Sequence, residues 1–265
     1  MKLIRAVSCW GNEVTPIEAV NLAREWNFEA VEGPAELLGE ITSEGVELFA
    51  EIVTGCTKGT YVSGLSTTPE QHLEEFRRKL DLALPLNPKR VTTMAGSDFW
   101  SFPVACRFLE DLVEIGEKSG VVVCVETHRS RPTFHPVRTA RLLAEIPHLS
   151  LTLDVSHWCA VCERLMPDEI ECMAVVEKRV RHVHARVGYD QGPQVPDPRV
   201  DSYQNELQSH LACWKRIARN HENEVSFTPE FGPDGYLHRD PKTGEGVADL
   251  REINRWMGGV LKSEL

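Results

Sequence analysis

Short apolar runs alternate with longer amphipathic stretches along all 265 residues of the chain. Most of these runs are rich in β-branched residues and are followed by a polar loop, as is typical of strands buried in a parallel sheet. Strands and helices that alternate in this way pair in parallel through right-handed crossovers. The pattern predicts eight strands, at Leu3–Cys9, Ala30–Glu32, Thr60–Leu65, Arg90–Met94, Val121–Glu126, Ser150–Asp154, Val180–Arg186 and Val225–Glu230.

The stretches between the predicted strands carry helix signals. Thr68-Pro69-Glu70-Gln71 reads as a capping box with proline at the first helical position. Apolar side chains then recur every three or four residues, which indicates the buried face of a helix. Similar spacing before and after the last predicted strand gives three such faces: Leu73, Phe76, Leu80 and Leu84; Leu207, Leu211, Trp214 and Ile217; and Leu250, Ile253, Met257 and Val260.

Eight strand–helix units in one continuous chain predict a single α/β domain, a closed (β/α)8 TIM barrel over residues 1–265. About 250 residues is a usual length for such a barrel. The alternative is an open doubly wound sheet, which usually carries a glycine-rich phosphate loop after its first strand. Here the first strand runs into Cys9-Trp10-Gly11-Asn12, without that motif. The barrel is therefore the predicted fold, with its active site at the C-terminal ends of the strands.

Composition and charge narrow the range of partners and compartments. The net charge of −11 argues against binding nucleic acid or an anionic membrane surface, because both need a basic face. No segment reaches the roughly 18 apolar residues of a membrane span, and Met1–Glu13 has no cleavage-site pattern. We therefore expect a cytoplasmic protein with reduced thiols, in which Cys159 and Cys162 form an incidental C-x-x-C pair.

Polar side chains end the last four predicted strands. Glu126, Asp154, His184 and Glu230 each follow an apolar run, and a barrel brings these strand ends to one rim. Three carboxylates that converge there repel one another unless a cation neutralises them. Carboxylate and imidazole ligands suit Mn²⁺, Mg²⁺, Co²⁺ or Zn²⁺. The sequence therefore predicts one divalent metal ion at these residues. His182, one layer deeper on the same strand, is expected to be a hydrogen-bonded core histidine.

The same region resembles a known family. The motifs are E-T-H at 126–128, D-x-x-H at 154–157, H-x-H at 182–184 and P-E-F at 229–231. Together they resemble the xylose-isomerase-like sugar isomerase/epimerase superfamily, over essentially the whole chain. The resemblance implies that Glu126, Asp154, His184 and Glu230 hold a single divalent metal. It also implies that His157, three residues after the aspartate, contacts a substrate oxygen.

The resemblance implies an isomerase or epimerase that acts on a sugar or a sugar-like polyol or keto substrate. A metal that holds a carbonyl and a hydroxyl acidifies the adjacent C–H by stabilising an enediolate. Glu126 and Glu230 are then the expected acid/base pair, and His157 completes the catalytic set. Arg186 could hold a substrate oxygen or phosphate, or form an ordinary salt bridge at the rim.

Further pocket candidates are Trp10, Glu32 and His128. In the long loop after the seventh strand, Gln191 stands in place of an arginine by which epimerases of this family contact substrate. Arg199, from the same loop, is the candidate substitute. Long loops of this kind are often lids or substrate clamps.

Three alternatives use the same barrel. A metal-dependent lyase, such as an inositol-type dehydratase, would expel a hydroxyl after the same proton removal. An apurinic-site endonuclease would need histidines at the ends of strands three and four, and Val62–Leu65 and Thr93–Gly96 contain none. A non-catalytic barrel would only bind its ligand. A homo-oligomer is compatible with all of these functions, since symmetric oligomers are common.

Overall fold

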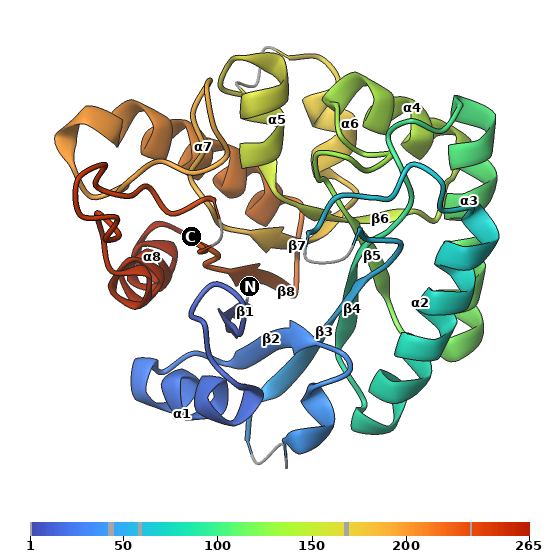
Figure 1. Cartoon of the computed structure of the whole chain (residues 1–265), viewed down its shortest axis with the longest axis horizontal. Helices are drawn as coiled ribbons and strands as arrows, with labels where there is room; N and C mark the ends of the chain where they lie inside the picture. Colours follow the sequence, from blue (N-terminus) through green and yellow to red (C-terminus); the bar gives the residue numbers. More distant parts are fainter. Residues whose placement is uncertain (1, 42–44, 58–59, 167–169, 234) are drawn as a thin grey trace.

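The computed structural model describes residues 2–41, 45–57, 60–166, 170–233 and 235–265. Eight strands form a closed parallel barrel, in which each strand pairs with the next and β8 pairs with β1. Figure 1 shows the barrel at the centre of the molecule. The strands are β1 (Lys2–Ser8), β2 (Ala30–Pro34), β3 (Glu47–Val53), β4 (Arg90–Met94), β5 (Val123–Glu126), β6 (Ser150–Leu153), β7 (Val180–His184) and β8 (Glu224–Thr228). The predicted single-domain (β/α)8 fold is confirmed.

The helices form the outer layer of the barrel (Figure 1). The predicted capping box is present. The Thr68 side chain accepts a hydrogen bond from the backbone N–H of Gln71, and the Gln71 side-chain oxygen accepts one from the backbone N–H of Thr68. The helices are α1 (Pro16–Trp26), α2 (Pro69–Ala83), α3 (Phe102–Ser119), α4 (Pro136–Glu145), α5 (Val155–Cys162), α6 (Met173–Glu177), α7 (Gln204–Arg219) and α8 (Leu250–Glu264), with 3-10 turns η1 (Leu38–Glu40), η2 (Leu84–Leu86) and η3 (Asp201–Tyr203). The main apolar core lies between these helices and the barrel.

The predicted third strand is wrong. Residues 60–65 lie in the connection between β3 and α2, where Ser63 forms an isolated antiparallel bridge to Cys56. The true strand, Glu47–Val53, reads E-L-F-A-E-I-V, and Glu51 interrupts its apolar run. Glu51 therefore lies on β3, in the barrel wall. An apurinic-site endonuclease would need a histidine at the end of the third strand. Residues 54–57, which follow the true β3, contain none.

The inside of the barrel is layered, since alternate residues of each strand point inward. Ile4, Ala6, Ala30 and Phe49 form a buried apolar layer toward the N-terminal ends of the strands. Two residues beyond Ala30 along β2, the buried Glu32 begins a polar layer with side chains from β4, β6, β7 and β8. The barrel therefore changes from apolar to polar toward its C-terminal end, where the predicted ligands lie.

Among the described residues, no helix is long and apolar enough to cross a membrane. All eight cysteines are free thiols, and Cys159 and Cys162 both lie on α5 without a bond between them.

Candidate functional site

The barrel brings the four predicted metal ligands together. Glu126 and His184 are the last residues of β5 and β7, Asp154 follows β6 directly, and Glu230 lies two residues beyond β8. One ligand atom from each of the four side chains lies within 4.8 Å of the others. Asp154 also caps α5, because its side chain accepts from the Ser156 amide at 3.0 Å. The positions of these four residues at strand ends therefore correctly predicted that they lie together in space.

The donor atoms of this cluster fit a divalent cation. His184 Nδ1 lies 3.1 Å from Glu230 Oε2 and 3.5 Å from Glu126 Oε1. Among the described residues, His184 Nδ1 and Glu126 Oε2 are buried without a hydrogen-bond partner. Buried polar atoms normally make hydrogen bonds, so two ligand atoms that make none in one cluster point to a missing partner. Carboxylate oxygens and an imidazole nitrogen would hold Mn²⁺, Mg²⁺, Co²⁺ or Zn²⁺.

Burial and mutual repulsion shift the pKa values in this cluster. Burial raises the pKa of Glu126 to about 7; His184 offsets part of this rise, while Glu230 and Asp154 add to it. Burial would lower the pKa of His184, but the carboxylates of Glu230, Glu32 and Glu126 hold it well above its usual value. Without a metal the cluster therefore retains protons that a bound cation would replace.

Arg186 lies beside the cluster and forms a buried salt bridge with Asp154. Its Nη2 pairs with Asp154 Oδ2 and lies 3.8 Å from Glu230 Oε2. Its guanidinium carbon lies 4.5 Å from the ring centre of Tyr236 and 5.7 Å from that of Trp10. Tyr236 was missed because it stands in an irregular loop after β8, where no sequence pattern indicates a pocket residue.

The two histidines predicted to contact substrate lie at different depths. His128 lines the cavity described below, whereas His157 is fully buried and is absent from the cavity wall. The two rings lie 4.0 Å apart. His157 Nδ1 accepts a hydrogen bond from Arg129 Nε at 3.1 Å, and its Nε2 lies 2.9 Å from Arg186 Nη2. His157 therefore supports the side chains of the wall from behind.

Two other predicted substrate contacts are not placed at the cavity. Glu32 is fully buried beneath the cluster and bonds to His182 and His184. Arg199 is held by Asp197, two residues earlier in the loop, and lies 3.4 Å from Glu252 on α8. That local ion pair draws Arg199 toward a separate hollow on the surface of α8. Neither residue is positioned to contact a ligand held by the four clustered side chains.

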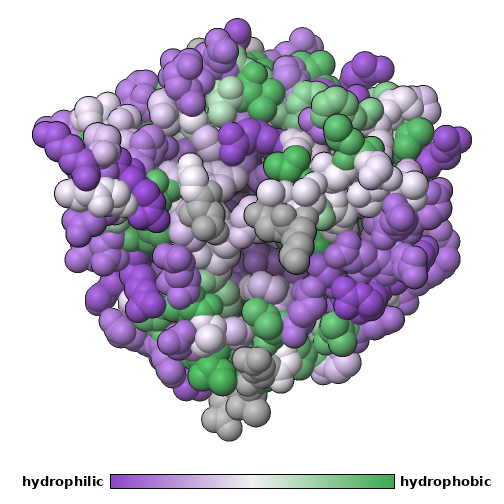
Figure 2. Space-filling model, viewed as in Figure 1, coloured by the Kyte–Doolittle hydropathy of each residue, from purple (hydrophilic) through white to green (hydrophobic). Residues whose placement is uncertain are grey.

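A cavity of about 200 Å³ opens over the cluster. Figure 2 shows a hollow near the centre of the face in view, surrounded by side chains of mixed polarity. The wall of the cavity contains the aromatic side chains of Trp10, Tyr61 and Tyr236 and the carboxylates of Glu126 and Glu230. The remaining lining residues are Pro34, Glu36, Glu51, Val53, Lys79, Met94, His128 and Arg186.

Glu51 is a second functional candidate that was not predicted from the sequence. It lines the cavity from β3, and burial raises its pKa well above the usual value, with the charges of Glu32 and Glu230 adding to the effect. The residue escaped notice because the third strand was placed at 60–65. The alternation of Phe49, Glu51 and Val53 on one face of the true strand is the signal that could have found it.

Comparisons with known proteins agree with this geometry. A sequence profile of the family described as Xylose isomerase-like TIM barrel matches residues 20–256. The chain therefore belongs to this family, as its motifs predicted. No curated protein matches the chain significantly.

Three solved structures illustrate the structural likeness. The IOLI protein with a bound zinc atom gives a TM-score of 0.67 at 14% identity, covering 100% of this chain and 99% of its own. The probable 3-DHS dehydratase AsbF from Bacillus anthracis gives 0.60 at 16% identity, with 98% of each chain covered. The 3-keto-D-glucoside 4-epimerase YcjR from E. coli gives 0.56 at 14% identity, covering 98% of this chain and 99% of its own. At such identities the likeness establishes the fold alone.

Proposed function

We propose that this protein is a divalent-metal-dependent isomerase or epimerase of a sugar or a sugar-like keto substrate. The observation that carries the proposal is the cluster of Glu126, Asp154, His184 and Glu230, of which Glu126 and Glu230 line a small cavity. Two of its ligand atoms are buried without a hydrogen-bond partner among the described residues. The zinc atom in the similarly folded IOLI structure is consistent with a metal in this family.

A bound divalent cation would stabilise negative charge that develops on substrate oxygens. The protein's own residues would then move the proton. Glu126 and Glu230 both line the cavity, from the ends of β5 and β8, so each can reach a carbon held between them. One carboxylate would remove the proton next to the carbonyl, giving an enediolate, and the other would return a proton. Return to a different carbon isomerises the substrate, and return to the other face epimerises it.

The size and polarity of the cavity favour a small polyhydroxylated substrate. Its volume of about 200 Å³ is below the roughly 300–1,000 Å³ of pockets for drug-sized ligands. Carboxyl groups can form hydrogen bonds with substrate hydroxyls, and Glu36 and Glu51 add two such groups to the cavity wall beyond the proposed metal ligands. A single sugar unit satisfies both the volume and the hydrogen-bonding pattern.

Glu51 supports a second candidate function, a lyase that removes water. Burial raises the pKa of Glu51 and so favours its protonated form, and a protonated carboxyl on the cavity wall can protonate a leaving hydroxyl. Glu126 or Glu230 would remove the proton in the same way as in the isomerase. One of the similarly folded proteins is named a probable dehydratase, which keeps this reaction class open for the family.

The test is an exchange experiment in heavy water. Metal-loaded protein is incubated with a panel of neutral keto sugars and keto polyols, and the products are followed by NMR. We expect deuterium at the carbon next to the carbonyl and a product of unchanged composition. A product that has lost water would favour the lyase. Binding of a panel member without exchange or turnover would favour a non-catalytic barrel.

Matched variants make the same experiment specific to the two glutamates. At saturating metal, Glu126→Gln and Glu230→Gln should each reduce turnover by about 10²–10⁴-fold, because the general base is lost. Glu252→Gln, on the exposed surface of α8, is the control and should retain the wild-type rate. If both site variants turn over at the wild-type rate, the proton-transfer scheme is wrong.

A further inference from the structure

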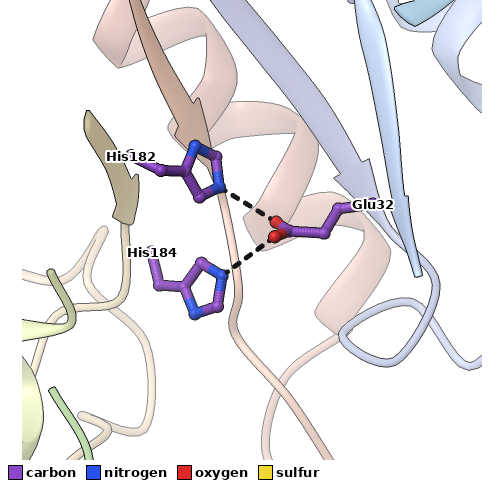
Figure 3. A group of neighbouring side chains, drawn as sticks. All are labelled: Glu32, His182 and His184. Atoms are coloured by element: carbon purple, nitrogen blue, oxygen red, sulfur yellow. Dashed lines mark hydrogen bonds and ion pairs between the residues drawn. The ribbon is translucent and has the colours of Figure 1, made fainter. Parts of the chain in front are cut away.

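A buried carboxylate beneath the cluster joins His184, one of the proposed metal ligands, to His182. Figure 3 shows His182 and His184, both from β7, pointing at the carboxylate of Glu32 on β2. His184 Nε2 lies 3.3 Å from Glu32 Oε1, and His182 Nε2 lies 3.1 Å from Glu32 Oε2. All three side chains are 0–1% exposed. The contacts cross the barrel interior, so only the closed fold brings them together.

The hydrogen bonds around Glu32 fix where the protons lie. Oε1 also accepts from the Thr92 hydroxyl at 2.9 Å, and Oε2 accepts from the Thr228 hydroxyl. An ionised carboxylate accepts hydrogen bonds and donates none, so both imidazoles must present an N–H to it at Nε2. In the neutral form of His184, Nδ1 then carries a lone pair. That atom is the one that faces Glu126 and Glu230 without a hydrogen-bond partner among the described residues.

This arrangement matches the role of a group that orients a metal ligand. A ligating histidine normally donates its other ring N–H to a carboxylate or carbonyl, which fixes the tautomer and ring orientation and makes the ligating nitrogen more basic. A ring that is free to flip would present Nε2–H or a rotated face to the metal for part of the time. Glu32 prevents this, because flipping His184 would break a buried charge-assisted hydrogen bond.

We propose that Glu32 is the positioning residue of the metal centre: it holds His184 in the Nε2–H tautomer and thereby directs Nδ1 at the metal. The inference rests on the metal centre in the proposed function. Glu32 acts through His184 and does not touch substrate, since it is fully buried and absent from the cavity wall.

The same three residues could instead bind a second cation, because their donor atoms lie within 4.8 Å of one another. The contacts favour positioning. His182 Nδ1 already bonds to Ser226 Oγ at 2.7 Å, and both Glu32 oxygens already accept from threonine hydroxyls. A cation here would have to displace these satisfied hydrogen bonds, whereas His184 Nδ1 above makes no hydrogen bond among the described residues.

The experiment measures metal affinity and not turnover. Metal-free wild-type protein and Glu32→Gln are titrated with Co²⁺, whose visible absorption reports both affinity and ligand geometry. We expect one Co²⁺ per chain in both proteins, with an affinity about 10–100-fold lower and an altered spectrum in the variant. Thr92→Val is the matched control: it removes a hydrogen bond to the same Glu32 oxygen but leaves the contact to His184, so its Co²⁺ affinity should remain near that of wild type.

A second measurement does not depend on the variant folding. In zinc-loaded wild-type protein, long-range ¹H–¹⁵N spectra should show His184 with its proton on Nε2. An Nδ1–H tautomer would overturn the proposal, as would equal Co²⁺ affinities and spectra in wild type and Glu32→Gln. Two ions per wild-type chain, one of them lost in the variant, would overturn it in favour of a second metal site. If wild-type protein binds no divalent ion, the metal centre itself fails, and the proposed function fails with it.

Discussion

Arg186 supplies a positive charge beside the carboxylates of the cluster when no cation is bound. Its guanidinium pairs with Asp154 Oδ2, and its Nε donates to Ser156 Oγ at 3.3 Å. Burial lowers the pKa of an arginine, but the carboxylate of Asp154 more than compensates here, so the pKa of Arg186 is raised. A fully buried ion pair of this kind contributes little net stability but becomes costly once one partner is removed.

Replacing this arginine should therefore destabilise the metal-free protein in particular. We expect Arg186→Met to lower the free energy of unfolding by about 3–5 kcal/mol, because Asp154 is left buried and unpaired. Added divalent metal should raise the free energy of unfolding of the variant by more than it raises that of wild type. Denaturant unfolding with and without metal measures both effects.

The control uses the same substitution at an exposed ion pair. Arg199→Met breaks the partly exposed pair with Asp197, which should cost about 0–1 kcal/mol, independently of metal. Equal losses in the two variants would contradict the role given to Arg186.

Glu51 provides a test that separates the two candidate reactions. Glu51→Gln retains the shape of a protonated carboxyl and should leave metal affinity near wild type, since Glu51 is outside the ligand cluster. If Glu51 only donates a hydrogen bond to substrate, we expect KM to rise about 5–10-fold, equivalent to roughly 1–1.5 kcal/mol. If it protonates a leaving hydroxyl, kcat should fall about 10²–10⁴-fold.

Glu47→Gln is the control on the same strand. Glu47 lies at the opposite end of β3 and pairs with Lys2 and Lys89 outside the cavity, so its replacement should leave both kinetic parameters unchanged. Wild-type kinetics in Glu51→Gln would remove Glu51 from either mechanism.

At the scale of elements, two loops from opposite ends of the chain build one wall of the cavity. The segment after β1 supplies Trp10, and the segment after β8 supplies Glu230 and Gly232. A Cβ on Gly232 would lie 2.0 Å from the Trp10 ring, so only glycine lets the indole pack there. Trp10 in turn packs edge-on against Tyr236, with ring centres 5.4 Å apart. The position of Glu230 thus depends on how these loops pack.

A pair of glycine substitutions tests this packing. Gly232→Ala should displace Trp10 and the loop that carries Glu230, lowering stability by about 1–3 kcal/mol, as overpacking does, and weakening metal binding. Gly259→Ala lies on the exposed side of α8 with nothing within 4 Å, and it should instead stabilise the protein by about 0.5–1 kcal/mol. Thermal unfolding and metal titration of both variants give the comparison. Unchanged metal affinity in Gly232→Ala would show that the loops adjust without moving Glu230.

At the scale of the whole molecule, metal binding is linked to pH. The metal-free fold raises the pKa of Glu126 from 4.5 to about 7 and also raises that of His184, so both groups bind protons more tightly in the folded than in the unfolded chain. Their contribution to stability is present at low pH and is lost as pH rises through these values. A cation binds the deprotonated forms, so it competes with the protons.

We therefore expect metal to stabilise the protein more at pH 8 than at pH 5.5. Below about pH 7, the apparent metal affinity should rise about tenfold per pH unit for each proton released. The increase in Tm on adding metal, measured across this range, follows the affinity because only the folded state binds. In Glu126→Gln, the slope of log affinity against pH should fall by one proton. A metal-induced Tm shift that is independent of pH would contradict the linkage.

The sequence by itself determined the repeating strand–helix order and, through it, the barrel and its C-terminal rim. Hydrophobic periodicity and helix caps are local signals, so the faces of α2, α7 and α8 were predictable from neighbouring residues. Glu126, Asp154, His184 and Glu230 were predictable for a related reason: a polar residue that ends an apolar strand can only lie at the rim. Glu51 was not predicted, because its carboxylate interrupts the apolar run of the strand that carries it.

Only the tertiary structure decided which side chains meet across the barrel. Glu32 and His184 are 152 residues apart on strands that do not pair, and closure of the barrel brings His184 Nε2 within 3.3 Å of Glu32 Oε1. Arg199 could have reached the cavity on sequence grounds, but Asp197 and α8 hold it elsewhere. Contacts between distant strands and loops depend on register, closure and packing, which no local pattern of hydrophobic and polar residues encodes.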